Sequence, residues 1–118
     1  MIEVQAIGAF GAIAHADRLR IVRMLVVAGA EGMSAGGIAA ALEKSQPSRV
    51  SFHLKELLRV GLVQKRREGK SLIYSADFPV LSDLVAFLMH DCCNGHCEYC
   101  DRAIKLLAQC TGRATGKG

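Results

Sequence analysis

Residues 44–70 constrain the fold more than any other stretch, because they predict a helix, a stop and a hairpin in direct succession. Positions 47–59 carry apolar residues at helical spacing, with Ser45 as the expected N-cap and a proline tolerated in the first turn. Gly61 is well suited to end this helix. The apolar stripe of the helix comprises Val50, Leu54, Leu57 and Leu58.

Two strands are expected after this helix, at residues 62–66 and 71–75, with a turn at residues 68–70 between them. A further helix is expected at residues 35–42, N-capped by Ser34, and it would pair with the 47–59 helix as a helix-turn-helix. A helix-turn-helix followed by a basic hairpin is the pattern of a winged helix-turn-helix. The expected fold class is therefore mainly α-helical with a β-hairpin wing.

Positive charge is concentrated in the same segment. It holds eight Lys and Arg residues and two acidic residues, a net charge of +6, whereas the whole chain carries +4. Such a concentration is typical of a surface that binds nucleic acid. The expected DNA-contacting residues are Gln46, Ser48, Arg49, Ser51, Phe52, Lys55 and Arg59 on the helix, with Arg66, Arg67 and Lys70 on the wing.

The roles expected on the helix follow from base chemistry in the major groove of double-stranded DNA. Arg49 can bond a guanine edge or a phosphate, Gln46 can pair with adenine, and Phe52 can touch a thymine methyl group. Lys55 and Arg59 are expected to meet phosphates, which contribute affinity without sequence information. The alternative interpretation is an ordinary helix with a solvated charged face.

Four other segments show helical spacing of apolar residues, at 4–15, 18–28, 80–92 and 98–109. Asp17 is the expected N-cap of the second of them. The helix at 80–92 is apolar enough to suggest a dimer interface, with a core inside one chain as the alternative. The expected apolar faces comprise Ile7, Phe10 and Ala14, then Leu19, Val22, Leu25 and Val26, then Leu81, Leu84, Val85, Leu88 and Met89.

Length and composition limit the remaining options. A chain of 118 residues favours one folded domain, expected at 1–92, followed by a cysteine-containing segment at 92–110 and a disordered Gly-rich tail at 111–118. No apolar run reaches the ~20 residues that span a bilayer, and no signal-peptide pattern is visible, so a cytoplasmic protein is expected. No Ser/His/Asp set, carboxylate pair or phosphate loop indicates an enzyme.

Four of the five cysteines fall within nine positions, at Cys92, Cys93, Cys97 and Cys100. Converging thiolates suit a soft, thiophilic centre. Trivalent arsenic bonds three sulfur atoms in a pyramid, which Cys92, Cys93 and Cys97 could supply, with Cys100 as the other candidate for the third ligand. The alternatives are tetrahedral zinc or cadmium with His96 in reserve, a redox-active disulfide, and a thiol protein that does not bind DNA.

The remaining chemistry-bearing residues are expected to have ordinary roles. Cys110 is interpreted as a buried or incidental thiol. His53 is expected to lie beside the apolar stripe and to reach a phosphate or a backbone carbonyl. His15, His90 and His96 are expected to be solvated or structural.

The runs SQPSRVSFHLKELLRVGLV and REGKSLIY resemble the ArsR/SmtB family of bacterial metalloregulatory repressors, over about residues 7–92. The resemblance implies a homodimer that binds operator DNA and leaves it when a metal or metalloid binds. It also implies that the 4–15 helix packs across the dimer.

One branch of that family has adjacent cysteines at the end of the last core helix and a third cysteine a few residues on, as this chain has. That likeness implies As(III) or Sb(III) as the inducer of an arsenic-resistance operon. Two other ligand sets of the family are missing here, since residues 32–37 contain no thiol and Asp83 and His90 do not complete a zinc site.

Overall fold

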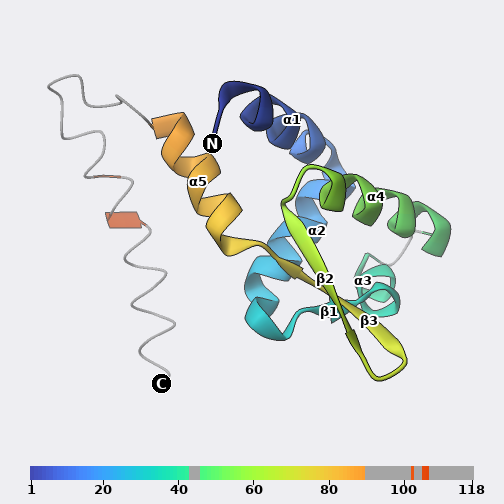
Figure 1. Cartoon of the computed structure of the whole chain (residues 1–118). Coiled ribbons are helices and arrows are strands. Elements are labelled where there is room, and N and C mark those ends of the chain that lie inside the picture. Colours follow the sequence, from blue (N-terminus) through green and yellow to red (C-terminus); the bar gives the residue numbers. More distant parts are fainter. Residues whose placement is uncertain (43–45, 90–101, 103–104, 107–118) are drawn as a thin grey trace, which may run out of the picture. The chain divides into compact units, whose positions relative to one another are not determined.

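The computed structural model describes residues 1–42, 46–89, 102 and 105–106, and within them it forms short helices and a small sheet (Figure 1). The chain divides into two compact units, Met1–Leu84 and Val85–Gly118. The elements are α1 (Glu3–Ile13), α2 (Ala16–Ala28), the 3-10 helix η1 (Gly29–Glu31), β1 (Met33–Ser34), α3 (Ala35–Ala41), α4 (Pro47–Arg59), β2 (Val63–Glu68), β3 (Ser71–Ala76) and α5 (Phe78–Met89).

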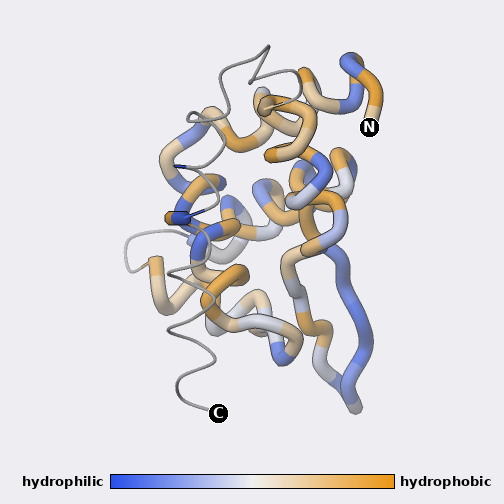
Figure 2. Tube along the Cα trace, turned by 90° about the vertical axis from the view of Figure 1, so that its left-hand side faces the viewer, coloured by the Kyte–Doolittle hydropathy of each residue, from blue (hydrophilic) through white to orange (hydrophobic). Residues whose placement is uncertain are grey.

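The three strands form one antiparallel sheet in the order β1-β3-β2. Strands β2 and β3 make the predicted hairpin, and its turn contains Gly69 in the left-handed conformation (φ 61°). Figure 2 shows a long hydrophilic run along the hairpin, as the Gln64–Glu68 part of β2 requires. Helices α3 and α4 followed by this hairpin are a winged helix-turn-helix, so the predicted fold class is confirmed.

The core of the first unit is built around the predicted stripe of α4. Val50, Leu54 and Leu57 are at most 1% exposed, and Leu58 packs at the edge of the core. Gly61 ends the helix with a left-handed backbone (φ 83°), as predicted. Other core residues, from α1, α2, α3, the loop before β2, the strands and α5, include Ala6, Ala9, Ala12, Ile21, Val22, Leu25, Ile38, Leu62, Val63, Ala76 and Leu84.

The prediction for the buried face of α2 was partly wrong. Leu19 and Val26 are 45% and 43% exposed, whereas Ile21 is fully buried. The predicted stripe was therefore rotated relative to the true one, because leucine and valine line both sides of this helix. In α1 the buried positions are alanines, and Ile7 and Phe10 are 64% and 38% exposed in the single chain.

Two predicted N-caps were wrong, and one was confirmed. Helix α2 begins at Ala16, and its N-cap is His15, whose side chain accepts a hydrogen bond from the Asp17 backbone N–H at 3.2 Å. The N-cap of α4 is Gln46 in place of the expected Ser45, and within the described ranges the Gln46 side chain makes no capping hydrogen bond. Ser34 caps α3 as predicted, because its Oγ accepts from the Gly37 N–H at 3.1 Å.

Helix α5 begins at Phe78, two residues before the predicted start, because Asp77 Oδ1 accepts a hydrogen bond from the Val80 N–H at 3.2 Å. Its predicted last turn, residues 90–92, lies outside the described residues. Of the helix predicted at 98–109, the three described residues, 102, 105 and 106, are helical. No helix in the described ranges is long and apolar enough to cross a membrane.

Candidate nucleic-acid interface

The outward face of α4 carries the residues that the sequence singled out. Its buried side is fixed by Val50 and Leu54 in the core, so the opposite positions must face solvent. Phe52 is an unusual member of that face, since 55% of a large aromatic residue is exposed. The predicted contact residues that are exposed are Gln46, Ser48, Arg49, Ser51, Phe52, Lys55 and Arg59.

Their partners differ along the helix. Arg59 donates to Glu56 Oε1 at 3.2 Å, an exposed pair three residues apart that is expected to contribute little to stability. Within the described part of the chain, Arg49 and Lys55 make no side-chain hydrogen bond or ion pair. On binding a ligand, neither charge would lose a contact with another described residue.

A residue that the sequence did not single out, Arg18 of α2, also reaches this face. Its guanidinium carbon lies 5.7 Å from the centre of the Phe52 ring, and its Nε donates to His53 Nδ1 at 3.1 Å. Arg18 therefore links the first turn of α2 to the recognition helix. No local pattern indicates this role, because Arg18 and His53 are 35 positions apart.

The wing residues divide into two kinds. Arg66 is held internally: it donates to the backbone carbonyls of Ala30 at 3.0 Å and Glu31 at 2.8 Å, and to Glu68 Oε2 at 2.8 Å. It therefore fastens β2 to the η1 turn. Arg67 and Lys70 are exposed and have no such partner among the described residues.

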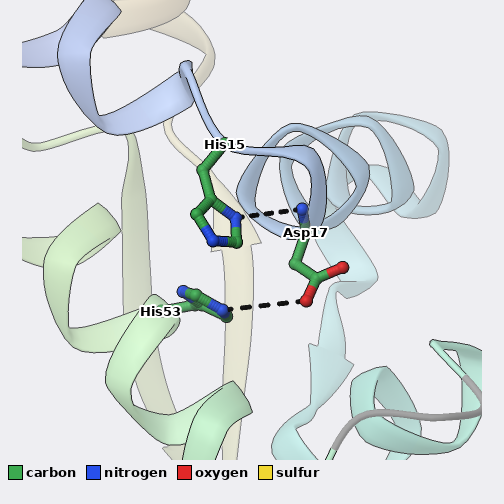
Figure 3. A group of neighbouring side chains, drawn as sticks. All are labelled: His15, Asp17 and His53. Atoms are coloured by element: carbon green, nitrogen blue, oxygen red, sulfur yellow. Dashed lines mark hydrogen bonds and ion pairs between the residues drawn. The ribbon is translucent and has the colours of Figure 1, made fainter.

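His53 was expected to reach a phosphate or a backbone carbonyl, and this prediction was wrong. The residue is 3% exposed and faces His15 and Asp17 (Figure 3). Burial is the main cause that lowers the pKa of His53 from its usual 6.5, and the nearby His15 and Arg18 lower it further while Asp17 opposes them. His53 is therefore neutral at physiological pH.

The predicted thiol site lies outside the described residues. This applies to Cys92, Cys93, Cys97 and Cys100, and to Cys110. The site and the choice of its third ligand stay predictions.

The exposed basic helix, the wing beside it and the paired helices define a DNA-binding protein of the winged helix-turn-helix class. A family described as a helix-turn-helix domain matches residues 13–66, which span α2, α3, α4 and most of β2. The match therefore covers the helix-turn-helix itself and the start of the wing.

Similar proteins make the family clear. A probable mercury resistance operon repressor of Streptomyces lividans is 35% identical over 112 residues, which cover 92% of this chain and 77% of that protein. A possible ArsR-family regulator of Mycobacterium bovis, whose homodimeric winged helix-turn-helix domain was solved in solution, is 28% identical with a TM-score of 0.57. That match covers 78% of this chain and 84% of the other.

A third likeness is to the crystal structure of a possible transcriptional regulator for arsenical resistance, at 29% identity and a TM-score of 0.58. It covers 66% of this chain and 77% of that one. The chain belongs to the ArsR family of winged helix-turn-helix transcriptional regulators. The predicted family is thereby confirmed, and the assignment to an arsenic-responsive branch stays a prediction.

Proposed function

We propose that this protein is a metalloid-responsive repressor. As a homodimer it binds double-stranded operator DNA, and it releases that DNA when As(III) or Sb(III) binds Cys92, Cys93 and a third cysteine. Release would derepress an arsenic-resistance operon. The observation that carries the proposal is four cysteines within nine positions, placed directly after the last helix of a DNA-binding domain.

Operator binding rests on α4 and the wing. A recognition helix enters the major groove with its N-terminal residues toward the base edges. Gln46 and Arg49, at the N-terminal end of α4, would then lie nearest the bases. Lys55 and Arg59 lie further along the helix and would meet phosphates. Arg67 and Lys70 would extend the phosphate contacts from the wing, while Arg66 holds the wing in place.

Dimerisation is supported by apolar residues that the single chain leaves uncovered. On α1, Val4 and Ile7 are 68% and 64% exposed, and Phe10 follows at the same three-residue spacing. On α5, Val85 and Leu88 are 49% and 65% exposed. Burial of such side chains contributes about 1.5–3 kcal/mol each, which favours association of two copies.

The ligand chemistry favours a trivalent metalloid. Three thiolates around As(III) leave no fourth position to fill, and Cys92, Cys93 and Cys97 supply three from one chain. Cys100 is the competing third ligand. Binding would reorganise the segment that follows α5, and a coupling free energy of about 1–3 kcal/mol suffices for a switch.

A second candidate inducer is the mercuric ion. It is favoured by the Streptomyces relative named as a probable mercury resistance operon repressor, which aligns with 92% of this chain. Mercury is also a soft ion, for which cysteine thiolates are suitable ligands. Two of the clustered thiols would be enough to bind a mercuric ion. A response to mercury would therefore not need both Cys97 and Cys100.

The test is fluorescence anisotropy of a labelled promoter fragment from the protein's own operon. Arsenite, mercuric chloride, zinc chloride and an oxidant are titrated separately into the preformed complex. Release by stoichiometric arsenite supports the proposal, and release by mercuric ion alone transfers it to the second candidate. Release by zinc or by the oxidant alone would mean that the proposed inducer is wrong. If the protein does not bind the DNA under any condition, the proposed function is overturned.

Cysteine variants then test the site itself. The Cys92→Ser and Cys93→Ser proteins are expected to bind the fragment normally and to stay bound in arsenite, whereas Cys110→Ser, the matched control, responds like the unmodified protein. Loss of response in Cys97→Ser or in Cys100→Ser identifies the third ligand. Loss of DNA binding itself in the Cys92→Ser protein would show that the thiols are structural.

A further inference from the structure

A second group of possible metal ligands lies at the junction of α1, α2 and the recognition helix. His15 and Asp17 come from the start of α2, and His53 comes from the middle of α4 (Figure 3). We propose that these three residues bind a divalent transition-metal ion such as Zn²⁺, Co²⁺ or Ni²⁺. The proposal uses none of the cysteines and so does not depend on the metalloid site.

The geometry brings one donor atom from each residue together. The three atoms lie within 4.8 Å of one another, and His53 Nε2 is 3.9 Å from Asp17 Oδ2. A tetrahedral ion with bonds of about 2.0–2.1 Å needs its donors about 3.4 Å apart, so the donor atoms must move closer by up to about 1.4 Å. His15 is exposed and the Asp17 side chain is 21% exposed, so solvent leaves both room to move toward the buried His53. The movement of His15 would break the N-cap hydrogen bond that its Nδ1 accepts from the Asp17 N–H.

An independent observation points to a ligand at this place. His53 Nε2 is buried and has no hydrogen-bond partner among the residues that the structure describes, and the His53 side chain is only 4% exposed. Buried polar atoms are almost always paired, so an unpaired one marks a position that an ion or a water can occupy. Figure 3 shows this nitrogen turned toward Asp17, inside the group.

The donor set suits the ion class. Two imidazole nitrogens and one carboxylate oxygen are ligands that Zn²⁺ and its neighbours accept, and three protein ligands leave a fourth position for water. The pair of imidazoles lies close, with ring centres 4.6 Å apart. A hard ion such as Mg²⁺ would prefer an all-oxygen set.

Metal binding would compete with Arg18. At present Arg18 Nε donates to His53 Nδ1, so the proton of the neutral ring is on Nε2. To bind a metal through Nε2, that proton must transfer to Nδ1, and Nδ1 can then no longer accept from Arg18. An ion in the site would therefore release Arg18, whose guanidinium lies over Phe52 on the DNA-facing side of α4.

The experiment titrates Co²⁺, followed by its visible absorption, and Zn²⁺ by competition, into the full chain with all five cysteines replaced by serine. We expect stoichiometric Co²⁺ binding by this chain. His15→Asn keeps an N-cap acceptor and Asp17→Asn keeps the side-chain shape, yet each is expected to weaken Co²⁺ binding by about tenfold or more. Asp83→Asn, an exposed carboxylate on α5, is the matched control and should change nothing.

The competition with Arg18 supplies a readout that a merely structural cluster would not give. Arg18→Ala removes both the donor to His53 and a nearby positive charge, so it is expected to tighten Co²⁺ binding by about fivefold. Arg23→Ala, an exposed arginine of the same helix, is the control.

Three results would overturn the proposal. They are no stoichiometric Co²⁺ binding by the serine-substituted chain, binding that His15→Asn and Asp17→Asn leave unchanged, or weaker binding in Arg18→Ala. Circular dichroism melting of each variant verifies that it is folded. Because the serine-substituted chain cannot respond to arsenite through thiols, failure of this site and failure of the proposed metalloid response are measured separately.

Discussion

Arg49 occupies the third position of α4, where its exposed side chain has no internal partner among the described residues. Arginine can bond both acceptors of a guanine, and such a pair discriminates against the wrong base by about 1–3 kcal/mol. Arg49→Ala is therefore expected to weaken operator binding by about tenfold to a hundredfold, measured by anisotropy at fixed salt. Arg23→Ala on α2 is the control and should bind normally.

The same measurement on a scrambled DNA fragment separates two roles of Arg49. A base contact predicts a large loss on the operator and a small one on the scrambled fragment. Equal losses on both fragments would mean that Arg49 meets phosphate only. An unchanged operator affinity would contradict the placement of α4 in the groove.

The residue scale also shows where sequence reasoning was insufficient. The exposure of Arg49 and Lys55 follows from helical periodicity, because the buried stripe leaves only one side to solvent. The partners of His53 cannot be inferred from helical periodicity, because His15 and Asp17 come from a different helix and no local pattern indicates that they approach His53. Arg66 was predicted from its charge alone, whereas its position is set by the Ala30 and Glu31 carbonyls.

At the scale of elements, Gly32 is a strict requirement of the sheet. Its φ is +68°, and an added Cβ would collide with the Tyr74 carbonyl oxygen of β3. Gly32→Ala is therefore expected to lower the free energy of unfolding by about 2 kcal/mol or more, through both the left-handed backbone and the clash. Urea unfolding monitored by circular dichroism measures the change.

Gly36 provides the matched control for this prediction. Gly36 lies in α3, and a Cβ there would meet no atom of the described residues within 4 Å. Gly36→Ala is expected to be neutral or to stabilise by up to about 1 kcal/mol, because alanine favours a helix more than glycine does. If the two variants were equally stable, the collision with β3 would not be present in solution.

Elements with a strong local pattern could be predicted, and elements made by distant pairing could not. The 47–59 helix, its glycine stop and the hairpin were found because apolar spacing and turn residues are local signals. Strand β1 has only two residues and exists because Met33 and Ser34 pair with Tyr74 and Ile73. The predicted start of α2 was wrong because His15, an uncommon N-cap residue, caps the helix in place of Asp17.

At the scale of the whole molecule, the apolar face of α1 predicts how two copies associate. Ile7 is 64% exposed between Val4 and Phe10 on one side of the helix. Ile7→Asp would place a charge in a dry interface, so the dissociation constant of the dimer is expected to rise by at least about tenfold. Analytical ultracentrifugation over a range of concentrations measures it.

Val27 is the control, because it is apolar and 88% exposed on α2. Val27→Asp should leave the dimer intact if association uses α1. An Ile7→Asp protein that remains as dimeric as the unmodified one would show that α1 lies outside the interface. Operator affinity should fall together with dimerisation, because two copies share the phosphate contacts.

Ser34 belongs to two structures at once: its backbone pairs with Ile73 in the sheet, and its Oγ holds the first turn of α3 through the Gly37 N–H. Separation of β1 from β3 would therefore also release the start of the helix-turn-helix. In hydrogen-exchange terms, the Gly37 amide and the amides at the β1–β3 edge should share one opening event. The β1–β3 edge of the sheet and the first turn of α3 then open and close cooperatively. Any effector that loosens this sheet edge therefore also unwinds the beginning of the helix-turn-helix.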